Sequence, residues 1–172
     1  MTEEQKTLVS LGHSLKQYLF GFEKMAESCE MYGDGSPAMA FYMASLYNFI
    51  SVFYLLDKKS DPRGGTLYKA LKPLGLEHHL DPAFDVLATP IGTTTFGEIV
   101  RIFRNQAIVH TKYVNADLDK LYEMADMEEP ANQEALQDGL LKLYWATKQL
   151  LLDLIDASGL PLSGFGGFMV PE

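Results

Sequence analysis

Apolar residues recur at steps of three and four over the first part of the chain, from Glu3 to Glu30. The stripe consists of Leu8, Leu11, Leu15, Tyr18, Phe22, Met25 and Cys29. This spacing places a narrow apolar seam along one side of a helix. Thr2 and Gln5 precede it in the capping-box arrangement, in which each side chain satisfies the other's backbone amide. The pattern predicts a long amphipathic helix that packs against a neighbouring helix.

The next apolar segment, Pro37 to Leu56, is hydrophobic nearly all round. Ser36 and Pro37 suit the N-cap and first-turn positions of a helix. The segment is long enough to cross a bilayer, but it lacks basic flanks and polar residues interrupt it. The interruptions are Ser45, Tyr47, Asn48 and Ser51. We therefore predict a buried central helix and no membrane span.

The middle of the chain alternates turns and short helical pieces. Asp57 to Gly65 is rich in turn residues, and short helices are predicted at Thr66 to Leu71 and Pro82 to Leu87. Thr95 and Glu98 form a second capping box. They open a helix whose apolar and histidine positions are Phe96, Ile99, Val100, Phe103, Ala107 and His110.

Two further helices are predicted towards the C-terminus. The first runs from Asp117 to about Met127, and a long one follows Pro130 and stops at Gly159. The stripe of the long helix consists of Leu136, Leu140, Leu143, Thr147, Leu150 and Leu154. No segment alternates as a strand would. The sequence thus predicts an all-α fold, an up-and-down bundle of four to five main helices with short extra helices in the middle, as one domain over residues 1–158 followed by a Gly/Phe-rich tail, 159–172.

Composition adds the cellular context. The 172 residues are 47% hydrophobic and 22% charged, which is typical of a globular chain. The single cysteine, Cys29, excludes an internal disulfide framework and is expected to be a small core residue. The acidic start, MTEEQKTLVS, lacks the features of a secretory signal. We expect a cytoplasmic protein.

Charge is distributed unevenly along the chain. The net charge of −9 argues against diffuse binding of nucleic acid, and no DNA binding is expected. However, no acidic residue occurs between Ile99 and Ala116. The basic residues of that window are Arg101, Arg104, His110 and Lys112. Any contact with RNA is therefore expected here.

Within this window, the segment RNQAIVH contains Arg104, Asn105 and His110, with five residues between the arginine and the histidine. This pattern resembles the motif of HEPN domains, helical bundles with an arginine, often followed by Asn or Asp, and a histidine after four to six residues. The resemblance implies a metal-independent endoribonuclease, often a toxin or a defence protein, that works as a homodimer without a cofactor. It also implies an antitoxin or nucleotidyltransferase partner. Some members carry a tyrosine two residues after the histidine, whereas Tyr113 comes three residues after it.

The residue types suit RNA cleavage on chemical grounds. An imidazole titrates near neutrality and can act as the base that activates the 2′-hydroxyl, which assigns His110 to that role. A guanidinium stays charged and offers a fork of donors to the phosphate in the transition state, which assigns that role to Arg104. Asn105 would orient either partner by hydrogen bonding. Arg101 and Lys112 would bind flanking phosphates, and the product would be a 2′,3′-cyclic phosphate.

Helix geometry leaves two interpretations of His110 open. On one helix, Arg104 and His110 would lie about 120° and about 9 Å apart, so they cannot touch. His110 also falls on the apolar side, where a hydrogen-bonded core histidine is the alternative. A homodimer would resolve this if the histidine faced the partner's arginine across a shared cleft. The competing function is a catalytically inactive HEPN-like bundle that acts as an interaction or ligand-binding module.

A weaker cluster contains Glu77, His78, His79 and Asp81. Adjacent histidines on an irregular loop seldom converge on one metal ion, so a solvated loop is favoured over a metal site. A metal-dependent enzyme that uses His78 and His79 remains the third hypothesis.

Overall fold

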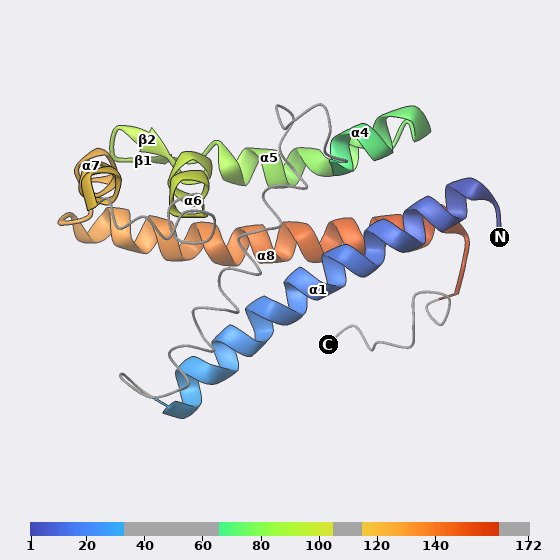
Figure 1. Ribbon diagram of the computed structural model, residues 1–172, viewed down its shortest axis with the longest axis horizontal. Coiled ribbons are helices and arrows are strands. Elements are labelled where there is room, and N and C mark those ends of the chain that lie inside the picture. The colour runs from blue at the N-terminus through green and yellow to red at the C-terminus, as the bar shows by residue number, and fades with distance from the viewer. Residues whose placement is uncertain (33–65, 105–114, 162–172) are drawn as a thin grey trace.

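Two long helices form the frame of the structure. The computed structural model describes residues 1–32, 66–104 and 115–161 (Figure 1). In it, α1 (Glu3–Tyr32) and α8 (Pro130–Ser158) run antiparallel and cross at an angle (Figure 1). Both helices were predicted from their apolar stripes, and both are confirmed.

The predicted capping box opens α1. The Thr2 amide donates to Gln5 Oε1 at 2.9 Å, and the Gln5 amide donates to Thr2 Oγ1 at 3.1 Å. Leu8 and Leu15 of the seam are fully buried, and Leu19 is buried beside them. The rest of the described seam is partly buried and packs against the same core.

The end of α8 also follows the sequence. Gly159 caps the helix with a left-handed backbone, φ 63°, and its amide donates to the Asp156 carbonyl at 3.1 Å. A residue without a Cβ adopts this conformation without strain. The buried side of α8 consists of Leu143, Tyr144, Thr147, Leu150, Leu151, Leu154 and Ile155. The predicted stripe therefore holds over the second half of the helix, whereas Leu136 and Leu140 are only partly buried.

A tyrosine joins the two long helices. The Tyr144 ring stacks on Phe22, with ring centroids 4.7 Å apart, and its hydroxyl donates to Glu23 Oε1 at 2.9 Å. Burial, the hydrogen bond to Glu23 and the negative charge of that carboxylate raise the pKa of Tyr144 to about 12. Near one end of α1, the Gln5 amide donates to the Ser158 carbonyl at 3.0 Å. These contacts fix the antiparallel pairing of α1 and α8.

Short elements cover α8 on another side from α1 (Figure 1). In chain order they are α4 (Leu67–Leu71), the 3-10 helices η1 (Lys72–Leu74) and η2 (Glu77–Leu80), α5 (Asp81–Leu87), α6 (Phe96–Arg104) and α7 (Asn115–Ala125). The two short helices predicted in this region are confirmed as α4 and α5. The predicted helix from Asp117 is α7, which begins and ends two residues earlier than expected.

The expectation of no strand was wrong between α5 and α6. Here β1 (Pro90–Ile91) pairs antiparallel with β2 (Thr94–Thr95), with Ile91 opposite Thr94. The two-residue turn starts with Gly92, whose φ is +56°, as hairpin turns of this length require. Two-residue strands are too short to show alternation, which is why the pattern missed them.

Helices make up most of the described residues, so the all-α class is confirmed. The core contains Leu67, Leu71, Leu80, Ile91, Phe96 and Val100 besides the buried residues of α1 and α8. None of the described helices combines the length and the apolar character needed to cross a membrane. The predicted central helix, Pro37 to Leu56, and the tail beyond Pro161 lie outside the described residues.

Candidate functional site

Helix α6 carries the first part of the predicted RNA site. Its buried side contains Phe96, Ile99 and Val100, and Arg101 is exposed. Arg104 is the last residue of α6. Asn105, His110 and Lys112 lie outside the described residues, so the distance between Arg104 and His110 stays a prediction.

Arg101 is engaged by an acidic residue of its own helix. Its Nε donates to Glu98 Oε2 at 2.8 Å, and its Nη2 donates to Glu98 Oε1. Thr95 Oγ1 accepts from the Glu98 amide at 3.3 Å, which is one half of the predicted capping box. The Glu98 carboxylate, which is the other member of the box, accepts both hydrogen bonds from Arg101. The pair is exposed, so a phosphate that competes for the guanidinium would give up about 1 kcal/mol or less.

The histidine pair after α4 separates into two different environments. His79 Nδ1 lies 2.9 Å from Asp153 Oδ2 on α8, whereas His78 Nδ1 lies 3.1 Å from the Gly75 carbonyl oxygen. Gln149 Nε2 donates to the second carboxylate oxygen of Asp153 at 2.8 Å. An ionised carboxylate only accepts, so in this contact the Nδ1–H of His79 donates to Asp153 and orients the ring. Sequence gave no signal for this pairing, because the two residues are 74 positions apart.

The possible metal ligands Glu77, His78, His79 and Asp81 do not form a metal site. Among the described residues, no group of three His, Cys, Asp or Glu side chains is arranged to hold a metal ion. Glu77 Oε2 is buried and, within the described part of the chain, has no hydrogen-bond partner. His79 is therefore an imidazole oriented by Asp153, and it lines neither of the two pockets described below.

A pocket of ≈ 370 Å³ opens where α6, α7 and the start of α8 meet. Its lining is mostly apolar, with a tyrosine and a glutamine as the polar members. The described lining residues are Ile99, Leu121, Tyr122, Ala125, Met127, Gln133 and Leu136. Concave apolar surfaces with few polar groups are the usual form of a ligand site.

The wall of this pocket is built by the end of α7. The Met127 amide donates to the Tyr122 carbonyl at 3.3 Å, and the Asp126 amide donates to the Glu123 carbonyl at 3.2 Å. This pair of hydrogen bonds is the Schellman motif, with Asp126 in the left-handed position at φ 48°. The motif typically brings the residues at its two ends into contact, and here both Tyr122 and Met127 line the pocket. It also ends α7 before Met127, two residues earlier than the sequence predicted.

The β-hairpin contacts the last turn of α7 through hydrogen bonds. The Thr93 amide and hydroxyl both donate to the Met124 carbonyl, at 2.8 and 3.0 Å. A Cβ on Gly92 would lie 2.6 Å from that same carbonyl oxygen, so only glycine allows this approach. On the other side, a Cβ on Gly139 would lie 2.7 Å from the Phe96 ring. Backbone contacts thus fix α6, α7 and α8 around the pocket.

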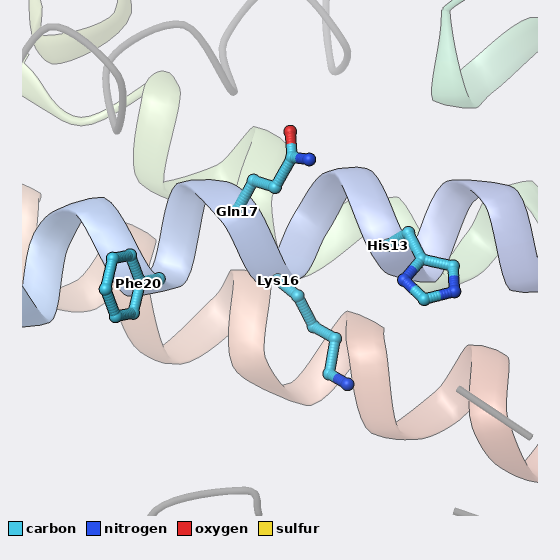
Figure 2. Close-up of a pocket in the computed structure, with 4 residues that line it drawn as sticks. All are labelled: His13, Lys16, Gln17 and Phe20. Atoms are coloured by element: carbon cyan, nitrogen blue, oxygen red, sulfur yellow. The ribbon is translucent and has the colours of Figure 1, made fainter. Parts of the chain in front are cut away.

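A second concave surface lies on α1 (Figure 2). It has a volume of ≈ 220 Å³, and its described lining is His13, Lys16, Gln17 and Phe20. Figure 2 shows Lys16 and Gln17 pointing to opposite sides of α1. Burial lowers the pKa of Lys16, and Lys24 lies 5.5 Å from the centre of the Phe20 ring. The four described lining side chains all come from α1, so the described residues supply groups from a single element.

Comparison with known proteins was negative at every level. No family model, no curated protein and no solved structure matches the chain.

Proposed function

We propose that the protein is a HEPN-like, metal-independent endoribonuclease, acting as a toxin or defence protein. The observation that supports this best is the two-sided character of α6. Ile99 and Val100 are buried, whereas Arg101 is exposed, and Arg104 follows Arg101 by three residues. Positions three and four apart are neighbours on a helix, so by register Arg104 lies between the exposed Arg101 and the buried Val100, at the edge of the exposed side.

In this proposal His110 takes the proton from the 2′-hydroxyl, and the oxygen attacks the adjacent phosphorus. The bond between phosphorus and the 5′-oxygen breaks, the 5′-oxygen takes a proton from water, and a 2′,3′-cyclic phosphate forms. Arg104 stabilises the extra negative charge on the phosphoryl oxygens. Asn105 orients the histidine or the phosphate, and Arg101 and Lys112 bind flanking phosphates.

A homodimer with two motifs in one cleft is part of the proposal. It removes the geometric objection, because a histidine of one copy then faces the arginine of the other. An antitoxin or nucleotidyltransferase partner would control such an enzyme in the cell.

The test is incubation of the purified full-length protein with total RNA in EDTA. Cleavage should yield ends with a 2′,3′-cyclic phosphate. His110→Ala and Arg104→Ala should each lower the rate by about 100-fold or more. His78→Ala is the matched control and should leave the rate unchanged. Among the described residues, this exposed histidine is seen to contact the Gly75 carbonyl and the His79 ring. Intact RNA, or cleavage that survives His110→Ala, contradicts the proposal.

The second candidate function is a catalytically inactive module. It is favoured by the double hydrogen bond that Glu98 makes to Arg101, which engages one of the proposed phosphate-binding side chains. If this candidate is correct, RNA stays intact at every protein concentration. Glu98→Gln separates the two, because it should strengthen RNA binding by an endoribonuclease and leave an inactive module unchanged.

A further inference from the structure

We propose that the pocket between α6, α7 and α8 binds a small, uncharged aromatic molecule that carries a hydrogen-bond donor. Within the described part of the chain, this site is separate from the residues proposed for RNA cleavage. None of its described lining residues is one of the residues proposed for phosphate binding or proton transfer.

The size of the pocket sets the first limit on the ligand. Its volume of ≈ 370 Å³ lies near the lower end of the range for small-molecule sites, about 300–1,000 Å³. A ligand of one or two fused rings therefore fits, whereas a chain-like or polymeric ligand would leave most of itself outside.

The lining sets the second limit, which is charge. No described lining residue carries a formal charge, and the walls are contributed mainly by Ile99, Leu121, Ala125 and Leu136. A charged ligand would lose its hydration here without an ion pair in return, which costs several kcal/mol. The aromatic Tyr122 and the thioether of Met127 favour a flat ring, because both interact well with an aromatic face or edge.

The polar groups set the third limit. Gln133 Nε2 donates to the Met127 carbonyl at 2.8 Å, which fixes the amide and leaves its Oε1 as an acceptor. Neither that oxygen nor the Tyr122 hydroxyl has a hydrogen-bond partner among the described residues. Tyr122 is 65% exposed and therefore forms the rim, where it can follow the ligand. Gln133 is exposed as well, so a ligand with one N–H or O–H group would replace water at the Gln133 oxygen.

The pocket is also formed before any ligand arrives. The Schellman motif at Asp126 connects Tyr122 to Met127, the Thr93 hydrogen bonds support α7 from behind, and Phe96 packs on Gly139. Preformed walls reduce the entropy lost on binding.

The experiment uses three naphthalene probes of matched size. These are 2-naphthol, which is neutral with a donor, naphthalene, which is neutral without one, and naphthalene-2-sulfonate, which is charged. Binding to the full-length protein is followed by the NMR signal of the Met127 methyl group, assigned with Met127→Leu. We expect 2-naphthol to bind saturably at one site with a Kd below about 1 mM, naphthalene to bind about 5-fold more weakly and the sulfonate to leave the signal unmoved.

Two variants locate the site. Leu136→Trp fills the pocket and should abolish binding, whereas Leu141→Trp places the same side chain on an exposed position of α8 and should not. Gln133→Leu should weaken the binding of 2-naphthol by about 5-fold and leave the binding of naphthalene unchanged. A Met127 signal that does not move with 2-naphthol, equal binding of the sulfonate, or binding that survives Leu136→Trp overturns the proposal. RNA cleavage is scored separately in the same preparation, so failure of one proposal does not imply failure of the other.

Discussion

The two ends of α8 are packed in different ways. Towards its C-terminus, α8 lies against α1, η2 and α5, and its buried leucines are covered from several directions. Side-chain pairs also connect it to its neighbours there, as with Tyr144 and Glu23 or Asp153 and His79. Towards its N-terminus, α8 contacts short elements that leave a pocket beside Gln133 and Leu136.

The helices that pack at the two ends of α8 differ in length. Helices α1 and α8 are long enough to bury a continuous seam, and the hydrogen bonds Gln5–Ser158 and Tyr144–Glu23 connect them. Helices α6 and α7 are short, and the hairpin holds them in place through backbone contacts at Gly92 and Thr93. Backbone contacts hold these walls in place, and among the described residues a pocket of ≈ 370 Å³ stays open between them.

The largest effect is expected from Gly92→Ala, in the hairpin that contacts α7 beside the pocket. The new Cβ would meet the Met124 carbonyl oxygen at 2.6 Å, and the residue would keep a left-handed φ. We expect the free energy of unfolding to fall by about 3 kcal/mol or more, measured by urea denaturation, because backbone atoms must move. The matched control is Gly75→Ala, because Gly75 also has a positive φ but nothing lies within 4 Å of its added Cβ. It should cost only about 1–2 kcal/mol, and equal costs would contradict the close approach of the hairpin to α7.

A pH effect is expected from Tyr144, where α8 packs against α1. Its folded pKa of about 12 lies above the ordinary value of 10, so the folded state holds this proton more tightly. The stabilisation is complete below pH 10 and is lost as the pH rises from 10 to 12. Its size is about 2–3 kcal/mol at most. Base denaturation of Tyr144→Phe should lack this component, and Tyr122→Phe, an exposed tyrosine, should behave as the unmodified protein.

A smaller effect is expected from the pair of His79 and Asp153, whose side chains are 26% and 24% exposed. A double-mutant cycle of His79→Ala and Asp153→Ala should give a coupling energy of about 0.5–1 kcal/mol that decreases with added salt. His78→Ala combined with Asp153→Ala should show no coupling. A coupling near zero for His79 would mean that this contact does not hold η2 on α8.

The smallest effect is a gain in stability from Asp126→Gly at the end of α7. The residue has φ 48°, where glycine is free of the strain that a Cβ causes. We expect about 0.5–1 kcal/mol of added stability by thermal unfolding, with binding in the pocket retained. Gln137→Gly, in an exposed interior position of α8, should instead lose about 1 kcal/mol. A loss at Asp126 would argue against the Schellman motif.

Sequence patterns predicted the helices with little error where the local signals were strong. The stripe and capping box of α1, and Pro130 and Gly159 around α8, gave those boundaries to within two residues. The hairpin was missed because its strands have two residues each, and the end of α7 was misplaced because an aspartate stands where a glycine would have marked it. The RNA site was predicted from residue spacing alone and stays a prediction, because most of it lies outside the described residues.

Sequence by itself determined the all-α class, because the period of apolar residues and the capping residues are properties of neighbouring positions. Which residues meet across the chain was decided by tertiary structure. The carboxylate that orients His79 lies 74 positions away, and the pocket needs three helices and a hairpin to exist. Local periodicity indicates which side of a helix is apolar. The distance between two packed helices, however, depends on all the backbone contacts that hold them, and these come from distant parts of the chain.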